Sequence, residues 1–177
     1  RIDYSTGPLR ETANNLDTAI VGEGFYEVRT PDGPRYSRKG SFSINDEGVL
    51  STRHGWPVLG QGGEIQIDGN RVEINEQGDV YVDDTLVDTL KIVDFPKPYD
   101  LEKIGDSLLA PKTPDIRPEP AQAYRIAQGF IEMSNVDAIR TMTDIIETLR
   151  VFESYQRVMK SADEATAKTV NEVGRSA

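Results

Sequence analysis

Short runs of apolar residues, several of them alternating with polar residues, fill the first 134 positions of the chain. Alternation such as that in 65–67 and 72–74 is typical of strands with one solvated face. Residues that favour turns separate the runs, and Asp68-Gly69-Asn70 is expected to form a hairpin turn between the two runs just named. The expected strands lie at residues 19–21, 25–28, 36–44, 49–50, 56–59, 65–67, 72–74, 80–82, 86–93 and 123–133.

Many short strands at close spacing predict an antiparallel β sandwich or a distorted barrel for a β-rich outer domain at residues 1–134. A proline-rich loop is expected at 95–122, with Leu108 and Leu109 attaching it to the β core. Aromatic residues on the predicted strands are expected to lie in the core rather than to form a stacking platform for sugars or bases. These aromatic residues are Phe25, Tyr26, Tyr36, Phe42 and Trp56.

The rest of the chain, residues 135–177, predicts a long amphipathic helix. No glycine or proline occurs from Asn135 to Val173, and Ser134 is a suitable N-cap. A helix of that length would be about 58 Å long, which exceeds what the β domain could cover. We therefore expect its apolar stripe to pack against partner helices, forming a subunit interface. Apolar residues recur along the stripe at Val136, Ile139, Met142, Ile146, Leu149, Phe152, Tyr155, Met159 and Ala162. The interface is assigned to seven of them: Val136, Ile139, Met142, Ile146, Leu149, Phe152 and Met159. The predicted fold is thus mainly β with a long C-terminal α-helix.

The charge of the chain narrows the classes of partner. The 177 residues include 20 Lys and Arg against 30 Asp and Glu, a formal net charge of −10. Phosphate backbones and anionic membrane surfaces attract basic proteins, so neither nucleic acid nor such a surface is an expected partner. No stretch approaches the ~18 consecutive apolar residues of a membrane-spanning helix, so membrane insertion is not expected.

Few residues are suited to catalysis or to metal binding. The chain has no cysteine and a single histidine, His54. We interpret His54 as a turn residue, because no nucleophile stands at a distance from it in the sequence that is typical of a catalytic pair. The glycine-rich segments 22–24 and 60–63 match no phosphate-binding motif. The acidic pairs 46–47 and 83–84 lack the ligand spacing of a calcium loop and are interpreted as solvated turns. We therefore assign no catalytic, metal-binding or cofactor-binding residue.

Four segments, in the right order along the chain, resemble the flagellar axial proteins and, within them, the rod proteins of the FlgF/FlgG family. Residues 16–26 (LDTAIVGEGFY) resemble the family's L-D-x-A-I-x-G-x-G-F-F, and residues 36–48 resemble its Y-T-R-x-G-x-F-x-x-N-x-x-G. Residues 55–60 resemble G-x-P-V-L-G, and residues 129–136 resemble G-x-L-E-x-S-N-V, the entry to the terminal helix. The matching positions include Leu16, Asp17, Gly22, Gly24, Phe25, Arg38, Gly40, Phe42, Gly55, Gly129, Ser134 and Asn135.

The resemblance implies a structural, non-enzymatic subunit of the bacterial flagellar basal-body rod. Such subunits pack their terminal helices with those of copies of themselves and of other rod and hook subunits, and they transmit motor torque to the hook across the periplasm. They are exported by the flagellar type III apparatus without a cleaved signal peptide, and they need no cofactor. Residues 61–65 after the third motif, the compact middle β segment and the extended tail are more similar to the proximal-rod branch, FlgF, than to the distal branch, FlgG.

The family's N-terminal helix, which the resemblance pairs with the C-terminal one, has no counterpart upstream of Arg1, so the chain is interpreted as a fragment. Alternative interpretations are a distal-rod or hook-type subunit, and a β-type binding module for cell-wall glycan or a protein ligand with a helical tether. A hydrolase that uses only carboxylates is a further alternative. A binding module predicts a discrete ligand, whereas a hydrolase predicts turnover that one acidic substitution abolishes.

Overall fold

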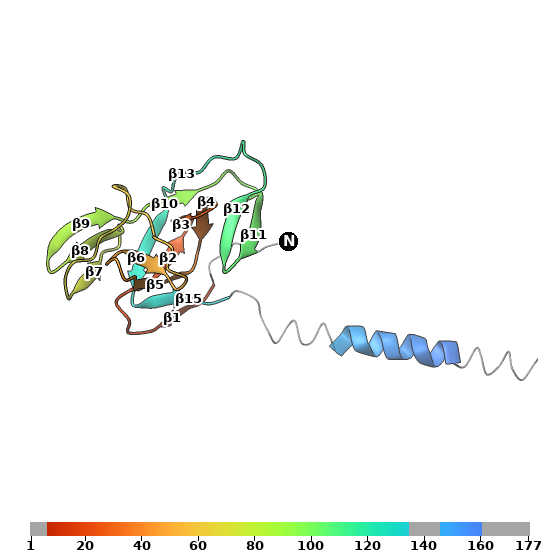
Figure 1. Ribbon diagram of the computed structural model, residues 1–177. Coiled ribbons are helices and arrows are strands. Elements are labelled where there is room, and N and C mark those ends of the chain that lie inside the picture. Colours follow the sequence, from red (N-terminus) through yellow and green to blue (C-terminus); the bar gives the residue numbers. More distant parts are fainter. Residues whose placement is uncertain (1–6, 135–145, 161–177) are drawn as a thin grey trace, which may run out of the picture. The chain divides into compact units, whose positions relative to one another are not determined.

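The computed structural model describes residues 7–134 and 146–160 (Figure 1). The chain divides into two compact units, Arg1–Asn135 and Val136–Ala177. The described residues of the first unit carry strands β1 to β15, and those of the second form a helix at 146–160. The predicted class, mainly β with antiparallel sheets and a C-terminal helix, is confirmed. Among the described strands, no sheet closes into a barrel.

The largest sheet has six strands in the order β11-β12-β4-β3-β10-β13, and every pairing in it is antiparallel. Strands β3 and β4 form a hairpin in which Thr30 pairs with Gly33, so the turn consists of Pro31 and Asp32. Gly33 has a φ of +105°, a conformation that glycine adopts without strain. The strands are β3 (Phe25–Thr30), β4 (Gly33–Ser37), β10 (Ile92–Asp94), β11 (Leu101–Gly105), β12 (Leu108–Pro111) and β13 (Glu119–Pro120).

A second sheet has four strands in the order β14-β2-β5-β6, again with antiparallel pairing. Its longest ladder joins β14 to β2, two strands that are about a hundred residues apart in the sequence. This ladder therefore joins parts of the β unit that are far apart in the sequence. The strands are β2 (Asp17–Gly22), β5 (Gly40–Ile44), β6 (Leu50–Thr52) and β14 (Tyr124–Gln128).

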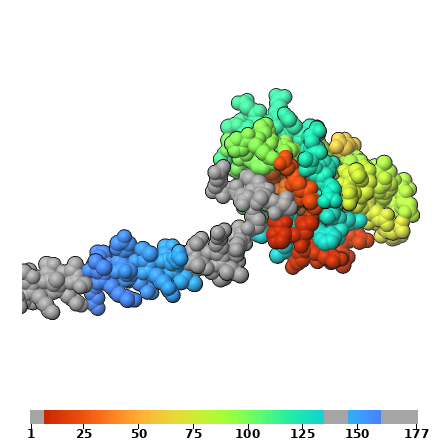
Figure 2. Space-filling model, turned by 180° about the vertical axis from the view of Figure 1, so that it is seen from behind, coloured from red at the N-terminus to blue at the C-terminus, as the bar shows by residue number. Residues whose placement is uncertain are grey.

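Two smaller sheets complete the β unit. Strands β7 (Val72–Ile74), β8 (Asp79–Val82) and β9 (Thr85–Thr89) form a meander at one end of the unit (Figure 1). Strands β1 (Leu9–Glu11) and β15 (Phe130–Glu132) form a two-stranded ladder that joins the two extremes of the described unit. Figure 2 shows the yellow-green meander and the green β11–β12 hairpin on opposite sides of the unit.

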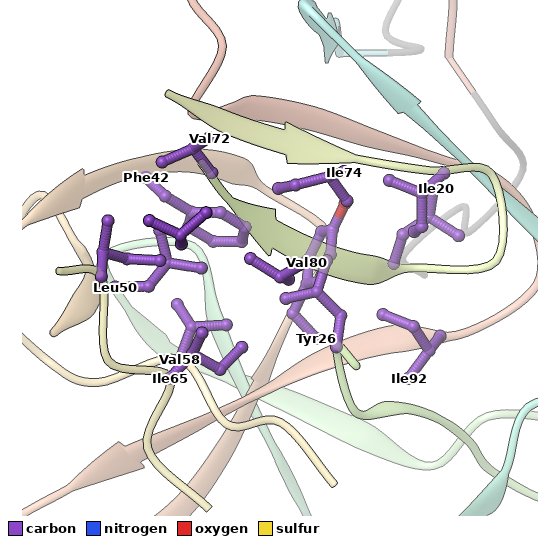
Figure 3. Packing of buried hydrophobic residues seen from close by; sticks show 14 residues of the cluster. Ile20, Tyr26, Phe42, Leu50, Val58, Ile65, Val72, Ile74, Val80 and Ile92 are labelled. Carbon is purple, nitrogen blue, oxygen red and sulfur yellow. The ribbon is translucent and has the colours of Figure 1, made fainter. Parts of the chain in front are cut away.

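Strands β3 and β10 form the wall between two hydrophobic cores. Tyr26 and Ile92, which pair across the ladder, belong to the larger core, whereas their neighbours Phe25 and Val93 belong to the smaller one. This follows from the period of two along a strand, which sends successive side chains to opposite faces. In the larger core, Tyr26 and Phe42 are surrounded by aliphatic side chains from β2, β6, β7 and β8 (Figure 3).

The aromatic core residues are confirmed with one exception. Phe25, Tyr26, Tyr36 and Phe42 are all buried, but Trp56 is only half-buried. The rings of Tyr26 and Phe42 meet edge to face at a centroid distance of 5.0 Å, the arrangement that aromatic quadrupoles favour.

Three predicted strands are each divided in the structure. The run 86–93 breaks at Leu90 and Lys91, between β9 in the three-stranded sheet and β10 in the six-stranded sheet. The run 36–44 breaks at Arg38 and Lys39, so that β4 and β5 belong to different sheets. The run 123–133 breaks at Gly129, whose φ of +79° no continuous strand could contain, and β14 and β15 pair with different partners. In these runs apolar residues occur on both sides of the break, so the apolar pattern does not mark it.

The expected hairpin turn at Asp68-Gly69-Asn70 is wrong. The 65–67 segment pairs instead with the chain around β6: the N–H of Leu50 donates to the carbonyl of Ile65 at 2.9 Å. Strand β7 pairs with β8 across the turn that ends at Gly78, where Asn75 Oδ1 accepts the N–H of Asp79 at 2.9 Å. The β7–β8 turn is thus closed by the side chain of Asn75, which accepts hydrogen bonds from its own turn.

The predicted loop at 95–122 contains strands β11, β12 and β13, and in this respect the prediction is wrong. The prolines flank these strands or end them, so the β11–β12 ladder keeps its hydrogen bonds. The expected attachment of the segment by Leu108 and Leu109 is confirmed, because both side chains are buried. Of the predicted helix 135–173, residues 146–160 are described as helix, and the rest of that range lies outside the described residues.

Candidate functional site

Three of the four family motifs meet at one largely buried arginine, Arg38. Its guanidinium donates hydrogen bonds to three backbone carbonyls: Ile20 at 3.1 Å, Gly22 at 3.1 Å and Gly24 at 3.0 Å. Gly22 and Gly24 have φ values of +111° and +116°. Their conformation turns these carbonyls toward the arginine and explains why the motif requires glycine at both positions. We call these residues, together with Glu132, the motif cluster.

Glu132 completes the motif cluster from the opposite end of the domain. Its Oε2 accepts a hydrogen bond from Nε of Arg38 at 3.0 Å, and the two side chains are only 12% and 15% exposed. Sequence reasoning assigned no role to Glu132, although it stands in the fourth motif. Its partner Arg38 is 94 residues away, so no local pattern could have indicated the contact. The one available signal was that Glu132 occupies the glutamate position of the G-x-L-E-x-S-N-V motif.

A second contact between motifs involves Gly40. This residue pairs with Thr18 in the β2–β5 ladder, and a Cβ at Gly40 would lie 2.0 Å from the carbonyl oxygen of Thr18. The hydroxyl of buried Thr18 is hydrogen-bonded to that of Tyr26 at 2.8 Å. Burial of the Tyr26 ring raises the pKa of its phenol well above the usual value, so the group is neutral at physiological pH.

The remaining motif residues that the structure describes support the fold locally. Asp17 and Phe42 are buried, and Leu16 packs against the larger core. Gly55 lies in an exposed turn with a φ of +80°, and its N–H donates to the carbonyl of Thr52 at 2.9 Å. Ser134 is exposed just after β15, and Asn135 lies outside the described residues. Most of the motif positions therefore specify turns and packing, not chemistry.

His54 lies in the exposed turn that also holds Trp56. Its Nε2 is 3.5 Å from a carboxylate oxygen of Asp106, and both side chains are about half exposed. The rings of His54 and Trp56 lie 5.3 Å apart. A small hollow of about 260 Å³ adjoins these residues, and in the part of the chain that the structure describes no hydroxyl of its lining is hydrogen-bonded to the histidine. The geometry thus places an exposed carboxylate beside His54, and among the described residues no hydroxyl is positioned for His54 to activate.

The glycine-rich segment 60–63 does not present free amides to a phosphate. The N–H of Gly62 donates to the carboxylate of Asp88 at 3.1 Å, and the N–H of Gly60 donates to the carbonyl of Gly63 at 2.7 Å. A carboxylate of the chain itself therefore occupies the position that an anion would take.

The acidic pair 83–84 also has structural partners. Asp83 accepts hydrogen bonds from the N–H of Asn70 at 3.2 Å and of Arg71 at 3.0 Å, and Asp84 forms an ion pair with Arg71. Hydrogen bonds from Thr89 and Asn75 lower the pKa of the Asp79 carboxyl, so this group is ionised at neutral pH. Within 7–134 and 146–160, no three metal-ligating side chains lie close enough together to hold an ion.

The C-terminal helix presents an exposed apolar stripe. Of the seven predicted interface residues, Ile146, Leu149, Phe152 and Met159 lie in the helix 146–160 and are 51–68% exposed. Val136, Ile139 and Met142 lie outside the described residues. Tyr155, on the same stripe, is also exposed. An uncovered apolar stripe on a helix indicates a surface that another element should cover.

Neither stretch of the chain that the structure describes contains a helix with the length and apolar character needed to span a membrane.

Two flagellar families match the chain. The family described as flagellar hook protein FlgE/F/G D1 domain matches residues 19–82, which include the glycine turn and Arg38. The family described as flagellar basal body rod FlgEFG protein C-terminal matches residues 127–172, which include β15 and the helix. The two matches together cover the motif cluster and the exposed stripe.

Individual relatives agree with the family matches. The chain is 35% identical to the flagellar basal-body rod protein FlgF of Caulobacter vibrioides, over 98% of this chain and 71% of the relative. It is 33% identical to the FlgG protein of Agrobacterium fabrum, over 91% of this chain and 66% of the relative. It is also 33% identical to the FlgG protein of Bacillus subtilis, over 95% and 69% respectively. The chain therefore belongs to the FlgF/FlgG family of flagellar basal-body rod proteins.

Proposed function

We propose that this chain is a structural subunit of the bacterial flagellar rod that polymerises through its C-terminal helix and transmits motor torque to the hook. In this proposal the β unit faces outward, and the helix packs with equivalent helices of neighbouring copies and of other rod or hook subunits. Contacts of this head-to-tail kind, related by a rotation that does not close, build a helical filament. The chain acts mechanically and catalyses no reaction.

The exposed stripe on the helix is the observation that carries the proposal. Leu149, Phe152 and Met159 have more than half of their surface exposed in the described part of the helix. Burial of apolar surface contributes roughly 25 cal/mol per Å², so covering such a stripe along a row of subunits would supply a large part of the assembly energy. A membrane-bound or nucleic-acid-bound role is disfavoured by the net charge of −10.

The location and position of the subunit belong to the same proposal. A rod subunit works in the part of the basal body that crosses the periplasm, and it reaches that place through the flagellar type III export apparatus without a cleaved signal peptide. Within the rod we favour the proximal position, because the sequence after residue 60 and the extended tail are more similar to that branch. Relatives of both names, FlgF and FlgG, match the chain at similar identity.

Leu149→Asp tests the proposal. The variant gene is expressed in a strain that lacks the wild-type gene, and swimming and purified basal bodies are scored by electron microscopy. We expect rods to be missing or shortened, because a carboxylate in a desolvated helix interface costs several kcal/mol. The β unit should remain folded, because Leu149 lies in the other compact unit.

Ser154→Asp is the matched control. It adds the same side chain to the same helix, but its position lies about 140° around the axis from Leu149 and is outside the stripe. We expect this variant to restore rods and swimming. Normal incorporation of the Leu149→Asp protein, or equal loss in both variants, would contradict assembly through the stripe.

A further inference from the structure

The Arg38–Glu132 pair of the motif cluster also binds the chain near its N-terminal end. While Oε2 of Glu132 accepts from Arg38, its Oε1 accepts a hydrogen bond from the N–H of Gly7 at 2.9 Å. Gly7 lies two residues before β1, and Glu132 is the last residue of β15. One carboxylate therefore joins the arginine of the β unit to both strands of the β1–β15 ladder.

The β1–β15 ladder buries little apolar surface of its own, although β15 also lies beside β2. Residues 9–11 are all exposed and residues 130–132 are half-buried, so burial of apolar side chains contributes little. Backbone hydrogen bonds hold the ladder together, for example from the N–H of Met133 to the carbonyl of Pro8 at 2.9 Å. Two strands without a hydrophobic face are marginally stable at best. Near its other end, the N–H of Gly129 donates to the carbonyl of Asp17 at 2.7 Å.

The arginine fixes the orientation of Glu132 as well as its distance from the core. The planar guanidinium holds three carbonyls of the glycine turn and one carboxylate oxygen at fixed angles, which a lysine ammonium would not do. The carbonyls belong to β2 and to the turn before β3, two elements of the buried core. A force on the chain at Glu132 is thus passed to the core through the guanidinium as well as along the backbone.

We infer that the Arg38–Glu132 pair couples the two strands at the ends of the β unit to its core, and so holds β1 and β15 in place against the core under load. Arg38 and Glu132 are positioning residues in this inference. The inference rests on the proposed function, since load arises only in a rod subunit. The fixed attachment itself can be measured on the purified chain without any assumption about function.

Glu132→Gln is the variant that tests the attachment. It preserves the shape of the side chain, but both oxygens of Glu132 accept hydrogen bonds from donors, so the new NH₂ group must face either Arg38 or Gly7. Hydrogen exchange of the whole chain, followed by mass spectrometry, compares residues 8–12 and 130–133 with β3. We expect exchange of the ladder to accelerate on the order of tenfold, because a buried donor loses its acceptor, while β3 keeps its protection.

Glu64→Gln is the matched control for this experiment. Glu64 forms an ion pair with Arg29 at 2.7 Å, but the pair is on the surface, with 35% and 56% of the side chains exposed. We expect this variant to leave the exchange of the ladder unchanged, because exposed pairs contribute little. Unchanged exchange of the ladder in Glu132→Gln, or equal acceleration in β3, would overturn the inference.

Swimming separates the inference from the proposed function. In cells with Glu132→Gln we expect rods to assemble, and swimming to be retained in dilute medium but lost in viscous medium, where the load is higher. Rods that assemble and swim normally at every viscosity would overturn the coupling and leave the rod assignment intact. Normal rods in a strain that lacks the gene would overturn the rod assignment, whereas the exchange result would still decide whether the pair fixes the ladder.

Discussion

Replacing Gly40 by alanine is expected to destabilise the β unit by about 3 kcal/mol or more, which is a large part of the stability of a domain of this size. A Cβ at this position would lie 2.0 Å from the carbonyl oxygen and 2.6 Å from the hydroxyl of Thr18. Thr18 is completely buried and hydrogen-bonded to Tyr26, so it has no space to move away. The two strands of the β2–β5 ladder would have to separate, and the measurement is urea unfolding of the whole chain.

Gly55→Ala provides the control for Gly40→Ala. Gly55 has a φ of +80°, but a Cβ there would meet nothing within 4 Å. Only backbone strain opposes the substitution, and it costs about 1 kcal/mol. A smaller loss of stability for Gly40→Ala than for Gly55→Ala would show that the close approach of β2 and β5 is not required by the fold.

The second large effect is expected at Tyr26. This residue is completely buried, and its ring contacts Phe42 edge to face in the larger core (Figure 3). Truncation to alanine leaves a cavity that close-packed strands on both sides cannot fill, and we expect a loss of about 4 kcal/mol in the free energy of unfolding. Urea unfolding followed by circular dichroism measures this loss.

Tyr26→Phe separates the ring from the hydroxyl. The variant keeps the packing and loses only the hydrogen bond to Thr18, so we expect a cost of about 1 kcal/mol. If the phenylalanine variant were as unstable as the alanine variant, the polar contact rather than the aromatic packing would hold the core together.

The class of the fold could be predicted from the sequence, because the alternation of apolar and polar residues and the positions of turn residues depend on local backbone geometry. This pattern located most strands of the two cores, and it assigned Leu108 and Leu109 to the interior. It failed where pairing is non-local: nothing near 65–67 indicates that this segment pairs with the chain around Leu50 rather than with the next strand. The prediction of a loop at 95–122 was also wrong. It rested on the many prolines, but these prolines flank the strands of the segment or end them.

The candidate site was predictable in one part only. The helical stripe was identified from its spacing, since helix periodicity is a local property, and its role as an interface stays a prediction. The role of Arg38 was not visible, because its partners stand 14, 16, 18 and 94 residues away. Only folding brings the glycine turn, the β4–β5 junction and the end of β15 to one place. The resemblance marked these residues without giving the physical reason for them.

The most direct test of a rod subunit is to image basal bodies purified from a strain that lacks the gene. We expect the rods to be missing or shortened and the cells not to swim, with both restored when the gene is returned. The level at which a shortened rod ends would show whether the subunit is proximal, as we propose, or distal. Complete rods and normal swimming without the gene would contradict the account.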